Sequence, residues 1–161
     1  MLKLILNKKY NPLFSSDARY FIITGGRGSG KSFAVTVFLT LLTMTKGIRI
    51  LFTRFTMTSA HLSIIPEFLE KIGLLGFDEV FSINKAEVVN TSNQSDILFR
   101  GIRTSAGNQT ASLKSLQGIS TWVLDEAEEL VDENIFDTID LSIREKNIHN
   151  RVVLILNPVT K

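Results

Sequence analysis

The residues with the clearest chemical meaning lie between positions 25 and 32. Gly25-Gly26-Arg27-Gly28-Ser29-Gly30-Lys31-Ser32 matches the phosphate-binding loop pattern, in which a glycine is followed by four residues and then by glycine, lysine and serine. Glycines suit this loop because successive backbone N–H groups must curl around phosphate oxygens at φ values and distances that a Cβ would obstruct. We expect Lys31 to reach the β- and γ-phosphates of a nucleotide and the Ser32 hydroxyl to bind Mg²⁺.

Two other interpretations of this loop fit less well. In a dinucleotide-binding fingerprint a further glycine would follow at a fixed spacing, but here the glycines at 26, 28 and 30 are followed by Lys31 and Ser32. A glycine-rich turn with a chance lysine would not require the predicted strand before the loop or the predicted helix after it. The loop therefore predicts a site for a nucleoside triphosphate with magnesium.

A second candidate group follows the apolar segment 121–124. Asp125 is expected to hold Mg²⁺ together with Ser32, and Glu126 to polarise a water for in-line attack on the γ-phosphate. This pair favours hydrolysis over phosphate transfer, because a kinase has less use for a carboxylate directed at water. The six further acidic residues from Glu128 to Asp140 are interpreted as a solvated face, with Asp132 and Glu133 suited to a helix N-terminus.

Short apolar runs alternate with longer helix-like segments along the chain, which is typical of an α/β fold. The strand-like runs are continuous rather than alternating, so we expect strands covered on both faces, as in a parallel sheet. Pro66 must either kink its helical segment or begin the second half of it. The segments 80–89 and 97–102 predict an inserted β-hairpin around a polar stretch. The expected strands are 20–23, 48–52, 122–124 and 152–156, and the expected helices are 32–45, about 59–75 and 135–143.

Composition excludes several classes of protein. The 161 residues are 44% hydrophobic and 21% charged, which suits one folded domain over 1–161 rather than a disordered segment. The absence of cysteine excludes disulfides and thiolate zinc sites, and only two distant histidines are present, so oxygen ligands are expected for any metal. No apolar run approaches the length of about 20 residues that spans a membrane, and no secretory signal begins the chain. We therefore expect a soluble intracellular protein that does not contact a membrane.

The net charge of +2 is unevenly distributed. Residues 1–54 hold nine Lys and Arg against one acid, and residues 55–161 hold nine against fifteen, which gives +8 and −6. A basic portion attracts polyanions, either a nucleoside triphosphate or a nucleic-acid backbone, but it can also be an ordinary solvated surface. Charge alone does not choose between these.

Together these motifs resemble the large terminase subunit of tailed bacteriophages, whose N-terminal ATPase domain drives DNA into the empty procapsid. The loop at 25–32 resembles that family's phosphate loop, including its arginine. Lys114-Ser115-Leu116-Gln117-Gly118 followed by 122–130 is similar to its Walker B region, and Leu156-Asn157-Pro158 to the segment that couples hydrolysis to movement. The resemblance covers nearly the whole chain. It implies a P-loop NTPase of the RecA-like (ASCE) class, a three-layer α/β sandwich with a mainly parallel central sheet and an inserted β-hairpin.

The resemblance also implies roles for single residues. Arg27 would stabilise the transferring phosphoryl group or communicate its state, although it can also be a surface loop arginine. The strands before Gly25 and Asp125 would flank the strand that ends at Leu156, so that Asn157 emerges beside the γ-phosphate to sense or orient the nucleotide; otherwise Asn-Pro is a simple turn. The segment 10–14 would contact adenine or pack in the core. A neighbouring subunit would contribute a cation, for which the candidates are Lys114, which we favour, Arg100, Arg103 and Arg144.

At the level of the protein, the resemblance implies an ATP- and Mg²⁺-dependent motor for viral DNA packaging. Its expected partners are double-stranded DNA of any sequence, the portal and procapsid, the small terminase subunit and further copies in a ring, in the cytoplasm of the infected bacterial host. Members of the family continue beyond this point into an RNase H-like nuclease, so we expect a C-terminally truncated fragment without nuclease activity, with the strand 20–23 at a sheet edge. The alternatives are a RecA-like helicase or recombination ATPase and a nucleotide-binding module without turnover.

Overall fold

The computed structural model describes residues 4–57, 60–104, 107–108, 112–113 and 115–158. Its strands are β1 (Tyr20–Thr24), β2 (Arg49–Thr56), β3 (Phe81–Ile83), β4 (Glu87–Asn90), β5 (Asp96–Thr104), β6 (Gly107–Asn108), β7 (Thr121–Leu124) and β8 (Arg151–Leu156). They form one eight-stranded sheet in the order β1-β8-β7-β2-β5-β4-β3, with β6 beside β5. The five strands from β1 to β5 in this order run parallel, and β4, β3 and β6 are antiparallel to their neighbours.

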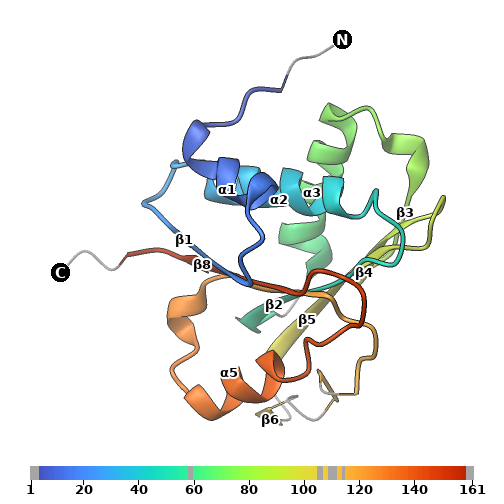
Figure 1. Ribbon diagram of the computed structural model, residues 1–161. Helices are drawn as coiled ribbons and strands as arrows, with labels where there is room; N and C mark the ends of the chain where they lie inside the picture. The colour runs from blue at the N-terminus through green and yellow to red at the C-terminus, as the bar shows by residue number, and fades with distance from the viewer. Residues whose placement is uncertain (1–3, 58–59, 105–106, 109–111, 114, 159–161) are drawn as a thin grey trace.

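Helices cover both faces of the sheet and make a three-layer sandwich (Figure 1). On one face lie α1 (Asn11–Ser15), α2 (Lys31–Leu42) and α3 (Ala60–Leu74), and on the other lies α5 (Glu133–Asp140). The short 3-10 helices are η1 (Lys8–Tyr10), η2 (Asp78–Val80) and η3 (Ala127–Glu129). None of the helices in the described part of the chain is long and apolar enough to cross a membrane.

Each face of the sheet has its own apolar core, because the central strands are buried on both sides. All four residues of β7 are buried, and the side chains of β7 divide between the two cores. Phe38, Phe52 and Phe68 belong to the core under α2 and α3, whereas Trp122 and Ile139 belong to the core under α5. The predicted parallel sheet and the three-layer α/β fold are therefore confirmed.

The predicted strand order is also confirmed, since β8 lies between β1 and β7. Because parallel strands present their carboxyl ends on one side of the sheet, the residues that follow β1, β7 and β8 all emerge on that side. Among the described strands β1 pairs only with β8, so β1 is an edge strand, as expected.

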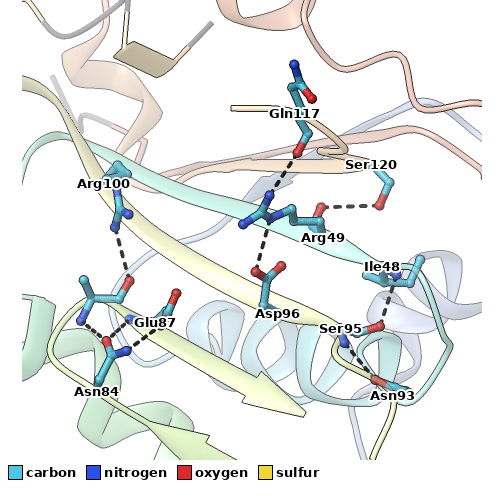
Figure 2. Close-up of polar contacts among 11 residues, drawn as sticks. Ile48, Arg49, Asn84, Glu87, Asn93, Ser95, Asp96, Arg100, Gln117 and Ser120 are labelled. Atoms are coloured by element: carbon cyan, nitrogen blue, oxygen red, sulfur yellow. Dashed lines mark hydrogen bonds and ion pairs between the residues drawn. The ribbon is translucent and has the colours of Figure 1, made fainter. Parts of the chain in front are cut away.

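The region from 80 to 104 differs from the prediction in two ways. The single predicted strand over 80–89 is divided into β3 and β4, because the Asn84 side chain accepts hydrogen bonds from the N–H groups of Ala86 and Glu87 at 2.9 and 3.0 Å and turns the chain between them. The hairpin of β4 and β5 is present, but β5 also pairs in parallel with β2. The second hairpin strand is therefore a strand of the main sheet (Figure 2).

Pro66 does not begin the second half of its helical segment, because α3 continues from Ala60 to Leu74 with Pro66 inside it; a kink at Pro66 stays a prediction. The ring removes one backbone donor at this position. The apolar side of α3 still packs on the sheet through Ile65, Phe68 and Ile72, which are all buried. Packing therefore outweighs the lost hydrogen bond.

Candidate nucleotide-binding site

The loop at 25–32 joins β1 to α2 at the carboxyl edge of the parallel strands. Gly28 and Gly30 have φ values of +75° and +80°, in the left-handed region that favours glycine. A Cβ on Gly25 would lie 2.8 Å from Ser29 Oγ, so a side chain there would fill the inside of the loop. The loop and Asn157 line a hollow of about 260 Å³. The backbone is thus shaped as a cradle.

Lys31 and Ser29 provide the polar groups of this cradle. Lys31 is only 7% exposed, and its Nζ donates to the carbonyl of Gly25, to that of Gly26 at 3.2 Å and to Asn157 Oδ1 at 3.0 Å. Ser29 Oγ is buried and has no hydrogen-bond partner within the described residues. A buried polar group without a partner is costly. Phosphate oxygens would accept hydrogen bonds from both side chains, so the loop fits the phosphates of a nucleotide.

Tyr10 supports the loop from the side of the core. It is 5% exposed, and its hydroxyl donates to the backbone carbonyl of Ser29 at 2.8 Å. Phe14, in contrast, remains 44% exposed and packs edge-on against Phe38 with ring centroids 5.3 Å apart. Of the two interpretations for segment 10–14, Tyr10 thus follows the core packing. An adenine contact by this segment stays a prediction.

Asp125 follows β7 and lies beside Arg54, near the end of β2, because Thr53 pairs with Leu124 in the sheet. Arg54 Nε donates a hydrogen bond of 2.8 Å to Asp125 Oδ2. The terminal nitrogen Nη2 of Arg54 lies 2.7 Å from the same oxygen. Ser32, Arg54 and Asp125 line one narrow cavity, and Ser32 also lines the hollow of the loop. The fold therefore brings the two predicted magnesium-binding residues to a common space.

The donor set fits magnesium rather than a transition metal. Within the part of the chain that the structure describes, no group of three or more histidine or acidic side chains could hold a metal ion alone. Mg²⁺ is typically bound by one or two protein oxygens together with water and substrate phosphates. The Ser32 hydroxyl and the Asp125 carboxylate supply that number of protein oxygens.

Glu126 has an unusual backbone conformation, with φ +54° and ψ +46°. Non-glycine residues in this left-handed region are uncommon and are often found at functional sites. The side chain is 39% exposed and lies 3.8 Å from Arg54 Nε. Burial raises the pKa of the Glu126 carboxyl above its ordinary value, although Arg54 acts in the opposite direction. A carboxylate with a raised pKa is a better proton acceptor.

Asn157 connects the loop with the segment that follows β7. Its Oδ1 accepts from Lys31, while its backbone N–H and its Nδ2 donate to the two carboxylate oxygens of Glu128, each at 3.2 Å. Asn157 therefore lies beside the phosphate loop. Glu128 differs from the expected solvated side chain, because it binds Asn157 across the site. The only sequence signal for this contact is an acidic residue in the turn after Glu126.

A comparison with models of protein families shows which family the chain belongs to. The family model described as phage terminase large subunit matches residues 17–161. The chain belongs to this family. Among curated proteins, no sequence matches this terminase chain.

Solved structures show the same fold at low sequence identity. The large terminase from a thermophilic bacteriophage is 10% identical, with a TM-score of 0.73, over 96% of this chain and 40% of that chain. The HK97 bacteriophage large terminase is 10% identical, with a TM-score of 0.70, over 95% of this chain and 33% of that chain. The N-terminal domain of the DNA packaging ATPase from bacteriophage phi29 is 15% identical, with a TM-score of 0.65, over 94% and 78%. This terminase chain thus spans well under half the length of the first two.

The arginines with expected roles in the terminase chain lie in different parts of the fold. Arg27 is exposed in the loop, lines its hollow and makes no ion pair within the described residues. Arg100 donates to two backbone carbonyls of the β4–β5 region, whereas Arg103 is exposed near the end of β5. Arg144 precedes β8 and therefore lies toward the opposite edge of the sheet. Lys114 lies outside the described residues. A cation for a neighbouring subunit stays a prediction.

Arg54 is the site residue that the sequence analysis missed. It is one of many cations in the basic first third of the chain, and no motif marks it. Its position becomes informative only when β2 is known to pair with β7, because Arg54 of β2 then lies beside Asp125, the residue that follows β7.

Proposed function

We propose that this terminase chain binds ATP with Mg²⁺ and hydrolyses the γ-phosphate, and that this reaction powers movement of viral DNA into the procapsid. The loop 25–32 holds the phosphates, and Lys31 contacts the β- and γ-phosphates. Ser32 and Asp125 hold the metal, and Glu126 activates the attacking water. The observation that carries the proposal is that Ser32 lines both the hollow of the loop and the cavity of Asp125.

The chemistry follows from the charges that these residues supply. Mg²⁺, held by Ser32 and Asp125, would offset the negative charge of the phosphates. Lys31 and the loop N–H groups stabilise the charge that develops on the leaving phosphate, and Glu126 accepts a proton from water. In the same proposal, the positive charge of Arg27 stabilises the transferring phosphoryl group. Asn157 senses the nucleotide through its bond to Lys31.

The comparisons support a packaging role. The large terminase from the thermophilic bacteriophage has been solved in complex with ATP-gamma-S and with ADP, and the phi29 relative is a DNA packaging ATPase. We extend nucleotide binding and packaging from these proteins to this chain. The proposed partners are double-stranded DNA, the portal and procapsid, the small terminase subunit and further copies in a ring, and the proposed location is the cytoplasm of the infected host. No observation favours a helicase or recombination ATPase.

Two substitutions test the proposal. Lys31→Ala should abolish ATP binding, because the loop loses its main positive charge, whereas Glu126→Gln should retain ATP binding and reduce turnover by about 10²–10⁴-fold. Calorimetry measures the binding, and release of inorganic phosphate in the presence of Mg²⁺ measures the turnover. Lys46→Ala, which removes an exposed lysine just after α2, is the matched control and should change neither.

Equal turnover by wild type and Glu126→Gln would remove Glu126 from its role. ATP binding without phosphate release by the wild type, even with DNA and procapsids added to the full-length protein, would favour the nucleotide-binding module instead.

A further inference from the structure

Arg54 and Asp125 form the most closely bonded ion pair at the nucleotide site. Two guanidinium nitrogens of Arg54 lie 2.8 and 2.7 Å from the same carboxylate oxygen, Oδ2. Both side chains are largely buried, at 27% and 12% exposed. Charge-assisted hydrogen bonds of this length are about twice as strong as neutral ones. Arg54 is therefore a strong competitor for any other cation that binds Asp125.

Ser32, Arg54 and Asp125 line a small cavity together with apolar side chains of the core beneath α2 and α3. The cavity that these three residues line has a volume of about 10 Å³, which is about the space of one water molecule. Mg²⁺ keeps several of its water ligands when it binds to proteins. A hydrated ion does not fit in this cavity, and Arg54 is the cation in it that already occupies Asp125 Oδ2.

Other carboxylates can receive the displaced guanidinium. Glu126 Oε2 lies 3.8 Å from Arg54 Nε, and Glu67 of α3 lines the same cavity as Arg54. Burial raises the pKa of the Glu67 carboxyl, and the positive charges of Lys71 and Arg54 act against this rise. A shift of Arg54 away from Asp125 thus keeps its charge among acidic groups.

We propose that Arg54 is a positioning residue that holds Asp125 in competition with the metal ion and releases it when the magnesium nucleotide binds. This inference rests on the proposed function, because it needs a metal at Ser32 and Asp125. Asp125 is held in place by the Arg54 guanidinium, so the free energy of Mg²⁺ binding includes the cost of breaking that ion pair.

The same geometry permits a different role, in which Arg54 contacts the phosphates directly. The two roles predict opposite results. A competitor for Asp125 weakens the contribution of the metal to nucleotide binding, whereas a phosphate ligand strengthens nucleotide binding with or without metal.

The test compares the affinity for ATP-gamma-S in EDTA with the affinity in Mn²⁺, a spectroscopic substitute for Mg²⁺, by calorimetry on the purified chain. In Arg54→Gln we expect the EDTA affinity to be unchanged and the gain from Mn²⁺ to rise about tenfold, the equivalent of one charge-assisted hydrogen bond. Electron paramagnetic resonance of the bound Mn²⁺ checks that the ion is held by the protein complex.

Arg49→Gln is the matched control, because Arg49 begins the same strand and pairs with Asp96 at 3.2 Å, at the opposite edge of the sheet (Figure 2). It should leave the Mn²⁺ gain unchanged. Arg54→Lys keeps the charge but loses the paired donors, so the gain should rise by less than in Arg54→Gln. This variant decides the question if Arg54→Gln does not fold.

An unchanged or smaller Mn²⁺ gain in the folded Arg54 variants overturns the inference, as does a loss of affinity in EDTA. Neither result affects the proposed function, provided that the wild type still hydrolyses ATP and Glu126→Gln does not. If the affinity of the wild type for ATP-gamma-S were the same in EDTA and in Mn²⁺, the proposed function itself would be contradicted.

Discussion

The two cations of the candidate site, Lys31 and Arg54, are held by oxygen atoms from other parts of the chain. Lys31 donates to two loop carbonyls and to Asn157 after β8, and Arg54 of β2 donates to Asp125 after β7. Burying a charge without such partners costs several kcal/mol. Each of these cations therefore fixes its own position only when the partner element is in place, which makes the site dependent on the complete sheet.

The ion pair at the other edge of the sheet gives a prediction about pH. Burial raises the pKa of Asp96 above its ordinary value of 3.8, although Arg49 acts against the rise. Asp96 holds its proton more tightly in the folded protein than in the unfolded chain. The free energy of unfolding of the wild type therefore decreases as the pH rises from 3.8 to the pKa of folded Asp96, and above that pKa this group causes no further decrease. Asp96→Asn does not titrate, so its stability relative to wild type should increase over this window.

Urea unfolding of both proteins at several pH values from about 4 to 7 measures this difference. If the Asn variant instead loses stability relative to wild type as the pH rises, the attraction of Arg49 outweighs the burial of Asp96.

At the scale of elements, the pairing of β2 with β7 decides which charged residues meet at the candidate site. Thr53 of β2 is fully buried, and its Oγ1 donates to the carbonyl of Val123 at 3.0 Å and accepts from Trp122 Nε1 at 2.9 Å. Trp122 is also fully buried and packs against Phe136 with ring centroids 5.1 Å apart. One hydroxyl thus joins the two strands directly before Arg54 and Asp125.

Thr53→Val tests this connection, because valine has a similar shape and no hydroxyl. The indole N–H of Trp122 would lose its partner in the core, and we expect the free energy of unfolding to fall by about 1–3 kcal/mol. Urea unfolding followed by the fluorescence of Trp122, the single tryptophan, measures the loss. Thr53→Ser keeps the hydroxyl and should lose less than Thr53→Val. A smaller loss in Thr53→Val than in Thr53→Ser would mean that the methyl group, not the hydrogen bond, stabilises the pair.

At the scale of the molecule, positive and negative charges are unevenly distributed along the chain. The basic residues 1–54 include the phosphate loop, and the acidic remainder includes Asp125 and Glu126. The sheet brings these two parts together at the carboxyl ends of its parallel strands, so the proposed triphosphate site lies between the positive loop and the carboxylates that we propose as metal ligands.

The proposed DNA partner leads to a prediction about how the protein binds DNA. A packaging motor must accept any sequence, so binding should depend on phosphate contacts rather than on bases. The affinity for two duplexes of unrelated sequence should be equal and should fall steeply with salt, with a slope of about −0.9 for each phosphate contact in a plot of log K against log [salt]. Fluorescence anisotropy at several salt concentrations measures both. A marked preference for one duplex, or a flat salt dependence, would contradict this mode of binding.

Much of this protein was determined by local sequence. The loop at 25–32 was recognisable because its chemistry needs glycines, a lysine and a serine at fixed spacing. The continuous apolar runs identified the parallel strands, and the central strands are buried on both faces, but β1 differs from the expectation because Tyr20 and Ile22 are exposed. The Asp125–Glu126 pair was identified in the same way, as acids that directly follow such a run. Helix α5 begins at a predicted acidic position, since Asp132 accepts from the N–H groups of Asn134 and Ile135.

Tertiary structure decided the rest, because contacts between distant strands depend on strand order and register. Arg54 acquires meaning only from the pairing of β2 with β7, and Glu128 only from the strand that delivers Asn157. The division of 80–89 into β3 and β4 is a local feature instead, because the Asn84 side chain accepts from the N–H of Ala86, and the sequence analysis missed it. Local sequence establishes which groups can do chemistry, whereas the sheet, through its register, determines which of them meet.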